Sequence, residues 1–317
     1  MERLVLLLCL LLPGALHSEI RTKGYLFGDY YYVASGANKE QNGFQIRRIY
    51  LTFDKRWDNR FTGRVRLEAN DAGFGVGEKM NAVIKDAYLK YKKKGRSLIV
   101  GLSPTPTWSF TEKVWGYRSV EKTIIDRNKI GSSRDLGVFF ESPVDSEGRV
   151  KIQLMLGNGN SNKSESNNDK KGYVRLDLVP GKTFGVNLYA DYETRPDDQN
   201  RTTLATLLYA QSRSRAFGFE AVWQQRKNAV AGTDSAVRGI SLFGRAKRTE
   251  EVGFFGRVDF LDPSDQASGD AVTRIFAGVD ITPDPQIHIM PNVIVETFQD
   301  SAVETVITPR VTLYFIF

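Results

Sequence analysis

Most of the chain beyond residue 20 alternates between apolar and polar residues with a period of two. In residues 60–70, for example, Phe61, Val65 and Leu67 share one face, whereas Arg64 and Arg66 lie on the other. Similar segments of about ten residues recur along the chain, separated by clusters of Gly, Asp, Asn, Ser, Pro and Lys. A strand with this pattern has an apolar medium on one side and water on the other. The pattern therefore predicts an all-β fold.

The alternating segments predict sixteen strands, an even number. They cover residues 22–33, 43–55, 60–70, 80–92, 96–103, 132–142, 149–157, 171–179, 182–192, 201–211, 215–226, 236–247, 251–261, 272–281, 285–296 and 304–317. Short connections alternate with longer ones, which is typical of a transmembrane antiparallel up-and-down β-barrel. We expect residues 19–317 to form this barrel.

A barrel of this size has room for a channel. Strands about 4.8 Å apart and tilted by about 40° give a diameter near 30 Å, which side chains cannot fill. The longest connection, residues 104–131, is therefore expected to fold inward as a constriction loop. Within it, Ser109 to Glu112 fit a capping box and predict a short helix.

The amino terminus resembles an export signal. Arg3 precedes the apolar run Leu4 to Leu12, Pro13 and Gly14 interrupt it, and Ser18 offers a small residue for cleavage. This order is typical of a secretory signal peptide, so we assign residues 1–18 to one. No later segment has enough consecutive apolar residues for a transmembrane helix.

The composition excludes some classes of site. The chain contains one Cys and two His, so neither a disulfide framework nor a metal site of several His or Cys is expected. No cofactor is expected either. The formal net charge of +7 alone would permit binding to nucleic acid, but the export signal and the terminal strand together exclude a soluble nucleic-acid-binding protein.

The last predicted strand carries Val311, Leu313, Phe315 and Phe317 on its lipid-facing side, and Phe317 is the final residue. In this respect the chain resembles bacterial outer-membrane porins. The resemblance implies that Phe317 is the assembly signal read by the barrel-assembly machinery, and that both termini lie in the periplasm.

A more specific resemblance comes from three segments: GFQIRRIYL at residues 43–51, KDAYL at 85–89 and GLSP at 101–104. They resemble the phosphate-selective porin O and P family. The resemblance implies a non-enzymatic, passive diffusion channel for small hydrophilic solutes or ions, with anions such as phosphate as candidates. It also implies an outer-membrane location among lipid, and a homotrimer.

Candidate anion contacts follow from the predicted water-facing side. They are Arg48, Arg64 and Arg66 on neighbouring strands and Lys113, Arg118, Lys122 and Arg127 in the constriction loop. Arginines in a narrow section of a pore would set anion selectivity. Acidic and basic residues are nearly balanced on the whole predicted lumen side, so the alternative that these charges only solvate the wall remains open.

Two basic residues, Arg47 and Lys85, fall on the lipid-facing side of this alternation. They would lie at the membrane rim, or a β-bulge would shift the register of their strands.

Two other functions remain alternatives. One is a surface barrel for adhesion or partner binding, using loops 158–170 or 262–271. The other is a barrel hydrolase using His288, which shares a face with Asn292 and Glu296, although no serine motif accompanies it. We therefore predict no catalytic residue.

Overall fold

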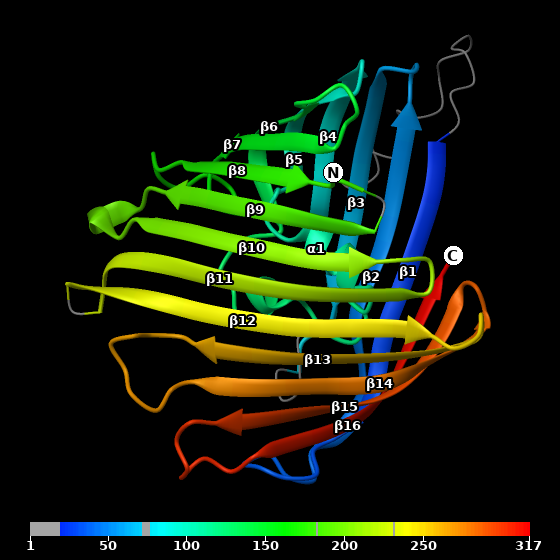
Figure 1. Ribbon diagram of the computed structural model, residues 1–317, viewed down its shortest axis with the longest axis vertical. Helices are drawn as coiled ribbons and strands as arrows, with labels where there is room; N and C mark the ends of the chain where they lie inside the picture. Colours follow the sequence, from blue (N-terminus) through cyan, green and yellow to red (C-terminus); the bar gives the residue numbers. More distant parts are fainter. Residues whose placement is uncertain (1–19, 72–76, 182, 231) are drawn as a thin grey trace, which may run out of the picture.

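The computed structural model describes residues 20–71, 77–181, 183–230 and 232–317. Within these residues, sixteen strands form one closed antiparallel barrel in which each strand pairs with its sequence neighbours and β1 pairs with β16 (Figure 1). The strands are β1 Ile20–Tyr32, β2 Asn42–Arg56, β3 Phe61–Asn70, β4 Asn81–Lys93, β5 Arg96–Pro104, β6 Arg134–Pro143, β7 Val150–Gly157, β8 Lys171–Leu178, β9 Phe184–Glu193, β10 Arg201–Gln211, β11 Arg215–Val230, β12 Thr233–Lys247, β13 Val252–Asp262, β14 Val272–Asp284, β15 Ile287–Phe298 and β16 Val306–Ile316. The all-β barrel prediction is confirmed. The predicted signal peptide, residues 1–18, lies outside the described residues.

The two faces of the strands follow the predicted alternation. In β10, Leu204 and Leu208 point outward and are 49% and 41% exposed, whereas Thr203 and Leu207 face the lumen and are buried. The outer wall is thus apolar and suits hydrocarbon, because each strand satisfies its backbone hydrogen bonds with its two neighbours.

The barrel closes between the two ends of the chain. The Phe317 amide donates to the Gly24 carbonyl at 3.0 Å, and the Gly24 amide donates back to the Phe317 carbonyl at 2.7 Å. The absence of a side chain at Gly24 matters, because a Cβ there would lie 2.4 Å from the Phe317 ring. The terminal residue therefore extends the β1–β16 pairing.

The prediction of a long connection between residues 226 and 236 is wrong. The alternation predicts strands at 215–226 and 236–247, but β11 runs to Val230 and β12 starts at Thr233. The two strands continue as a hairpin with a register shift between Arg226 and Val230. Residues 227–230 and 233–235 therefore extend the two strands although they lack the apolar alternation, since strand pairing beyond the membrane does not need an apolar face.

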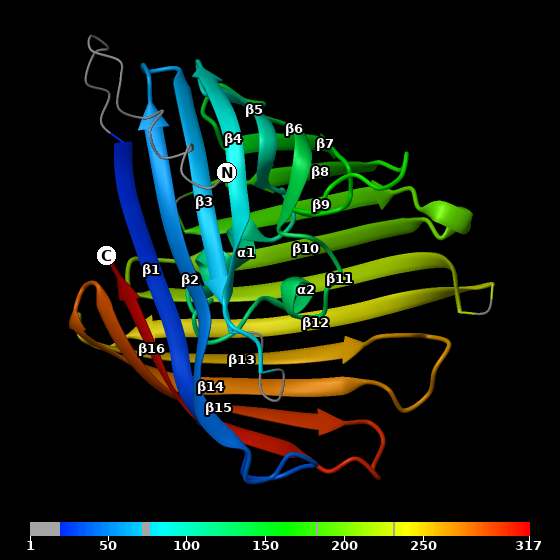
Figure 2. The ribbon, with the colours of Figure 1, turned by 180° about the vertical axis from the view of Figure 1, so that it is seen from behind.

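The connection between β5 and β6 enters the barrel and carries two short helices, α1 Ser109–Trp115 and α2 Ile124–Arg127 (Figure 2). The inward-folded loop is thereby confirmed. A single turn of 3₁₀-helix, η1 Pro196–Asp198, follows β9. None of the helices in the described part of the chain is long and apolar enough to cross a membrane.

Candidate functional site

The constriction loop, predicted as residues 104–131, spans residues 105–133 between β5 and β6, and its apolar side is attached to one wall of the barrel. Val114 and Trp115 are buried in a cluster with Phe243 of β12 and Phe255 of β13. Ile124, Ile125 and Trp108 form a second cluster with the following barrel residues: Val222, Val237, Leu261 and Val272. Burial of these side chains holds the loop against strands β10–β15, so its polar side faces β1–β4.

The first helix of the loop forms differently from the prediction. Trp108 occupies the N-cap without a side-chain hydrogen bond, so the predicted capping box starting at Ser109 is wrong. Thr111 instead donates its hydroxyl to Glu220 Oε1 of β11 at 3.0 Å. Gly116 ends the helix with φ of 78°, a conformation that favours glycine.

Polar side chains from the barrel wall also hold the loop, mainly by its carbonyl groups. Gln224 donates to the Ile130 carbonyl at 2.6 Å and Arg257 donates to the Lys122 carbonyl at 2.6 Å. Arg47 donates to the Val120 carbonyl at 2.8 Å. These bonds satisfy backbone groups that have no helical or strand partner.

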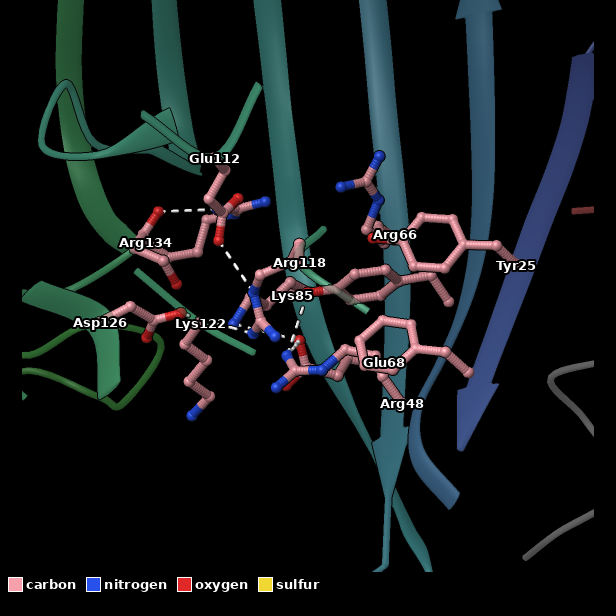
Figure 3. A pocket seen from close by; sticks show the side chains of 13 residues that line it. Tyr25, Arg48, Arg66, Glu68, Lys85, Glu112, Arg118, Lys122, Asp126 and Arg134 are labelled. Atoms are coloured by element: carbon pink, nitrogen blue, oxygen red, sulfur yellow. Dashed lines mark hydrogen bonds and ion pairs between the residues drawn. The ribbon is translucent and has the colours of Figure 1, made fainter. Parts of the chain in front are cut away.

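A cavity of about 240 Å³ lies between the polar side of the loop and strands β1–β4 and β6 (Figure 3). Six basic side chains and three carboxylates line it. The basic residues are Arg48, Arg66, Lys85, Arg118, Lys122 and Arg134, and the acidic residues are Glu68, Glu112 and Asp126. We call this space the constriction cavity. Its lining carries an excess of positive charge.

Carboxylates hold most of these cations in place. Glu68 Oε2 lies 2.5 Å from Arg48 and 3.1 Å from Lys85. The fully buried Asp86 pairs with both Arg66 and Arg134. On the loop side, Arg118 lies 2.9 Å from Glu112 and 3.4 Å from Asp126. Shared carboxylates fix the positions of the cations without neutralising all of them.

Two β-bulges bring Arg47 and Lys85 into the lumen. The register of β1 with β2 passes from Phe27–Arg48 to Gly28–Ile46, which leaves Arg47 as an extra residue. The register of β3 with β4 passes from Arg66–Asp86 to Leu67–Ile84, which leaves Lys85 as an extra residue of β4. The extra residue of a bulge changes the face of the sheet to which a side chain points. The bulge alternative for these two residues is therefore the correct one.

The structure brings four of the seven candidate residues together in the constriction cavity: Arg48, Arg66, Arg118 and Lys122. The other three lie elsewhere. Arg64 pairs with Asp54 in a second cavity of about 800 Å³ near the β2–β3 and β4–β5 turns. Arg127 pairs with Glu121 and Glu296, and Lys113 is exposed on α1.

Two further cations line the cavity but were not among the predicted residues, namely Lys85 and Arg134. Lys85 was not named as a lining residue, because its two alternatives, the membrane rim and a β-bulge, were left open. Arg134 is the first residue of β6 and stands on the side opposite the lumen-facing Asp135, yet its side chain reaches Asp86. In the sequence, the only sign that Arg134 contributes to the site is that a basic residue directly follows the loop.

Two carboxyl groups of the loop have shifted pKa values. Burial raises the pKa of Glu112 above its ordinary value, and Arg118 only partly offsets this effect. Burial also acts to raise the pKa of Glu121, but the charges of Arg127 and Arg47 outweigh it and bring that pKa down to about 2. Glu121 thus remains ionised at neutral pH.

His288 takes part in attaching the loop. Its Nδ1 lies 2.9 Å from Asp280 Oδ1, and Tyr117 of the loop donates to Asp280 Oδ2 at 3.2 Å. The nearby Ser119 donates its hydroxyl to Met290 Sδ, and no hydrogen bond joins a serine to His288 in the part of the chain that the structure covers. The arrangement is one of attachment and does not resemble a hydrolase triad.

No group of three or more His, Cys, Asp or Glu that could hold a metal occurs among residues 20–71, 77–181, 183–230 and 232–317.

A closed barrel with an apolar outer wall and a charged loop inside its lumen defines a transmembrane channel of the porin class. The family model described as phosphate-selective porin O and P matches residues 21–245. The chain belongs to this family and is an outer-membrane porin channel. None of the curated proteins matches it in sequence.

Solved structures share the fold at low sequence identity. An anion-selective porin from Comamonas acidovorans has a TM-score of 0.72 at 12% identity, covering 94% of this chain and 99% of its own. The outer-membrane channel DcaP of Acinetobacter baumannii has a TM-score of 0.67 at 14% identity, covering 94% and 97%. A trimer form of OmpT from Vibrio cholerae has a TM-score of 0.65 at 8% identity, covering 94% and 99%.

Proposed function

We propose that this porin conducts anions in preference to cations, and that the constriction cavity sets the preference. The observation that carries the proposal is the lining of that cavity, where six basic side chains face three carboxylates. Charge in the narrowest part of a pore governs which ions enter it, since the surrounding low-dielectric walls strengthen the field.

The positions of the cations support this function. Lys122 lines the cavity from the loop and forms no ion pair with any residue in the described ranges. Arg66 and Arg134 share one carboxylate, and so do Arg48 and Lys85. Each pair therefore retains one positive charge that can attract a passing anion. Phosphate, which the family description names, is one candidate anion.

The direct test is a charge reversal inside the cavity. Lys122→Glu should move the reversal potential in a KCl gradient toward cation selectivity. The matched control is Lys129→Glu, which makes the same change at an exposed loop residue that does not line the cavity. Equal shifts in the two variants would show that the cavity does not determine selectivity.

The processed chain, residues 19–317, would lie in outer-membrane lipid after removal of the signal peptide, residues 1–18.

We also propose that Phe317 is the assembly signal for the barrel-assembly machinery. Its ring packs on Gly24 across the closing strand pair, and it remains 56% exposed. In cells, Phe317→Ala should reduce the heat-modifiable, folded fraction, whereas detergent refolding should be less affected. Equal losses in both would make Phe317 a packing residue only.

A homotrimer is the proposed assembly. OmpT of Vibrio cholerae, which shares the barrel fold, has a trimer form. The mass of this chain in detergent, measured by light scattering with correction for bound detergent, tests the proposal. A monomeric mass under conditions that preserve channel activity would contradict it.

A further inference from the structure

Aromatic rings form one side of the constriction cavity. Tyr25 and Phe27 of β1 and Tyr50 of β2 line it together with the basic residues. The ring centroids of Tyr25 and Tyr50 are 4.8 Å apart in an edge-to-face arrangement, and Tyr314 of β16 meets Tyr25 at 5.7 Å. The rings are thus held by one another, and the edge-to-face geometry is a favourable one for aromatic pairs.

Guanidinium groups lie beside these rings. Arg66 Cζ is 5.0 Å from the centroid of Tyr50, and Arg48 Cζ is 5.6 Å from the same ring. Arg118 Cζ lies 5.9 Å from the centroid of Phe27. Positive charge and apolar surface therefore occur next to each other, and Figure 3 shows the Tyr25 ring beside Arg66 at the edge of the cavity.

This combination discriminates between kinds of anion. The face of an aromatic ring carries partial negative charge, so it gives a small, fully hydrated inorganic anion no favourable contact. An anion with a flat apolar body can place its carboxylate at the guanidinium groups and its body against the rings. The cavity of about 240 Å³ has room for roughly eight water-sized groups at about 30 Å³ each, which is more than inorganic phosphate fills.

We propose that the constriction cavity binds aromatic carboxylates in preference to inorganic phosphate. The inference rests on the proposed anion selectivity and specifies its substrate class. In this arrangement Arg48, Arg66 and Lys122 attract the carboxylate, and the partly exposed ring of Tyr25 contacts the ring of the solute. Tyr50 is only 7% exposed and supports the Tyr25 ring from behind.

The test uses block of the chloride current through the refolded full chain by benzoate, acetate and phosphate. Benzoate should half-block at a concentration about three- to ten-fold lower than acetate, the range expected from one or two aromatic contacts, and also lower than phosphate. Tyr25→Ser should remove this advantage, whereas Tyr25→Phe should keep it. Tyr88→Ser is the matched control, because Tyr88 lines the larger cavity near the turns and not the constriction cavity.

The outcomes separate the two proposals. A chloride-selective current that benzoate blocks no better than acetate would overturn the aromatic preference and leave the anion selectivity standing. The same loss in Tyr25→Ser and Tyr88→Ser would also overturn it, because the preference would then not arise in the constriction. A cation-selective current in the wild-type channel would overturn both. Heat-modifiable gel mobility of each variant shows that the barrel has folded.

Discussion

Lys85 Nζ lies 3.1 Å from Glu68 Oε2 on the adjacent strand, although strict alternation along β4 would place Lys85 among lipid tails. The β-bulge that turns it inward adds a cation to the constriction cavity. The bulge at Arg47 on β2 similarly aims a guanidinium at the loop, where it binds the Val120 carbonyl. Two irregularities in the sheet thus place charges in the narrow part of the lumen.

Lys85→Gln should lower anion preference, because Glu68 then neutralises more of the Arg48 charge. The expected result is a measurable shift of the reversal potential in a KCl gradient toward the cation side. Arg238→Gln is the control, since Arg238 lies on the outer face of β12 and is 59% exposed. Unchanged selectivity in Lys85→Gln would mean that the bulge has no role in permeation.

Selectivity should also depend on pH through Glu112. Its pKa is raised above the ordinary 4.5 by burial, so this carboxylate takes up a proton at a higher pH than an ordinary glutamate does. Protonation removes one of the negative charges of the cavity, and anion preference should therefore increase as the pH falls from 7.5 to 5. Reversal potentials measured across this interval test the expectation. In Glu112→Gln the change should be smaller, and an identical pH dependence in that variant would exclude Glu112 as its source.

Acid should weaken the attachment of the loop through Glu121. The folded pKa of about 2 lies below the ordinary 4.5, so the ionised group stabilises the folded state above pH 4.5, and this contribution is lost between pH 4.5 and about pH 2. Thermal unfolding in detergent should show a larger drop in Tm over this interval for the wild type than for Glu121→Gln. Parallel curves for the two proteins would contradict the role of the Glu121–Arg127 pair.

Glu220 of β11 lowers the stability of the contact between α1 and the barrel wall. It is 2% exposed, accepts one hydrogen bond from Thr111, and leaves Oε2 without a partner among the described residues. A buried charge without a direct ion-pair partner is destabilising. Glu220→Gln keeps the acceptor for Thr111 and removes the charge, so it should stabilise the protein by about 1 kcal/mol at pH 8. Thr111→Val should instead destabilise it. A lower Tm for Glu220→Gln would contradict this account.

Much of the fold could be predicted from the sequence, because the alternation records which side of each strand meets lipid. The outward Leu204 and Leu208 and the inward Thr203 follow it directly. The extension of β11 and β12 was missed, since residues 227–230 and 233–235 lie where neither face of the strands must be apolar. The bulges at Arg47 and Lys85 were left open, because one extra residue changes the facing of a strand without changing its composition.

The site could be predicted less well. Strand parity placed Arg48 and Arg66 on the lumen side, and the inward fold of the loop brought in Arg118 and Lys122; all four line the constriction cavity. Arg127 was included on the same reasoning, but it points to Glu121 and Glu296. Which side of a loop faces the open lumen depends on its packing against β10–β15, and that packing involves residues more than 100 positions away in the sequence, such as Phe243 beside Trp115.

The central claim is that a net positive constriction makes this porin an anion channel. The most direct measurement is the reversal potential of the refolded wild-type protein in a planar bilayer under a tenfold KCl gradient. The account predicts stable conductance steps and a potential directed toward the chloride equilibrium value. A potential directed toward the potassium value, from protein shown by gel mobility to be folded, would contradict it.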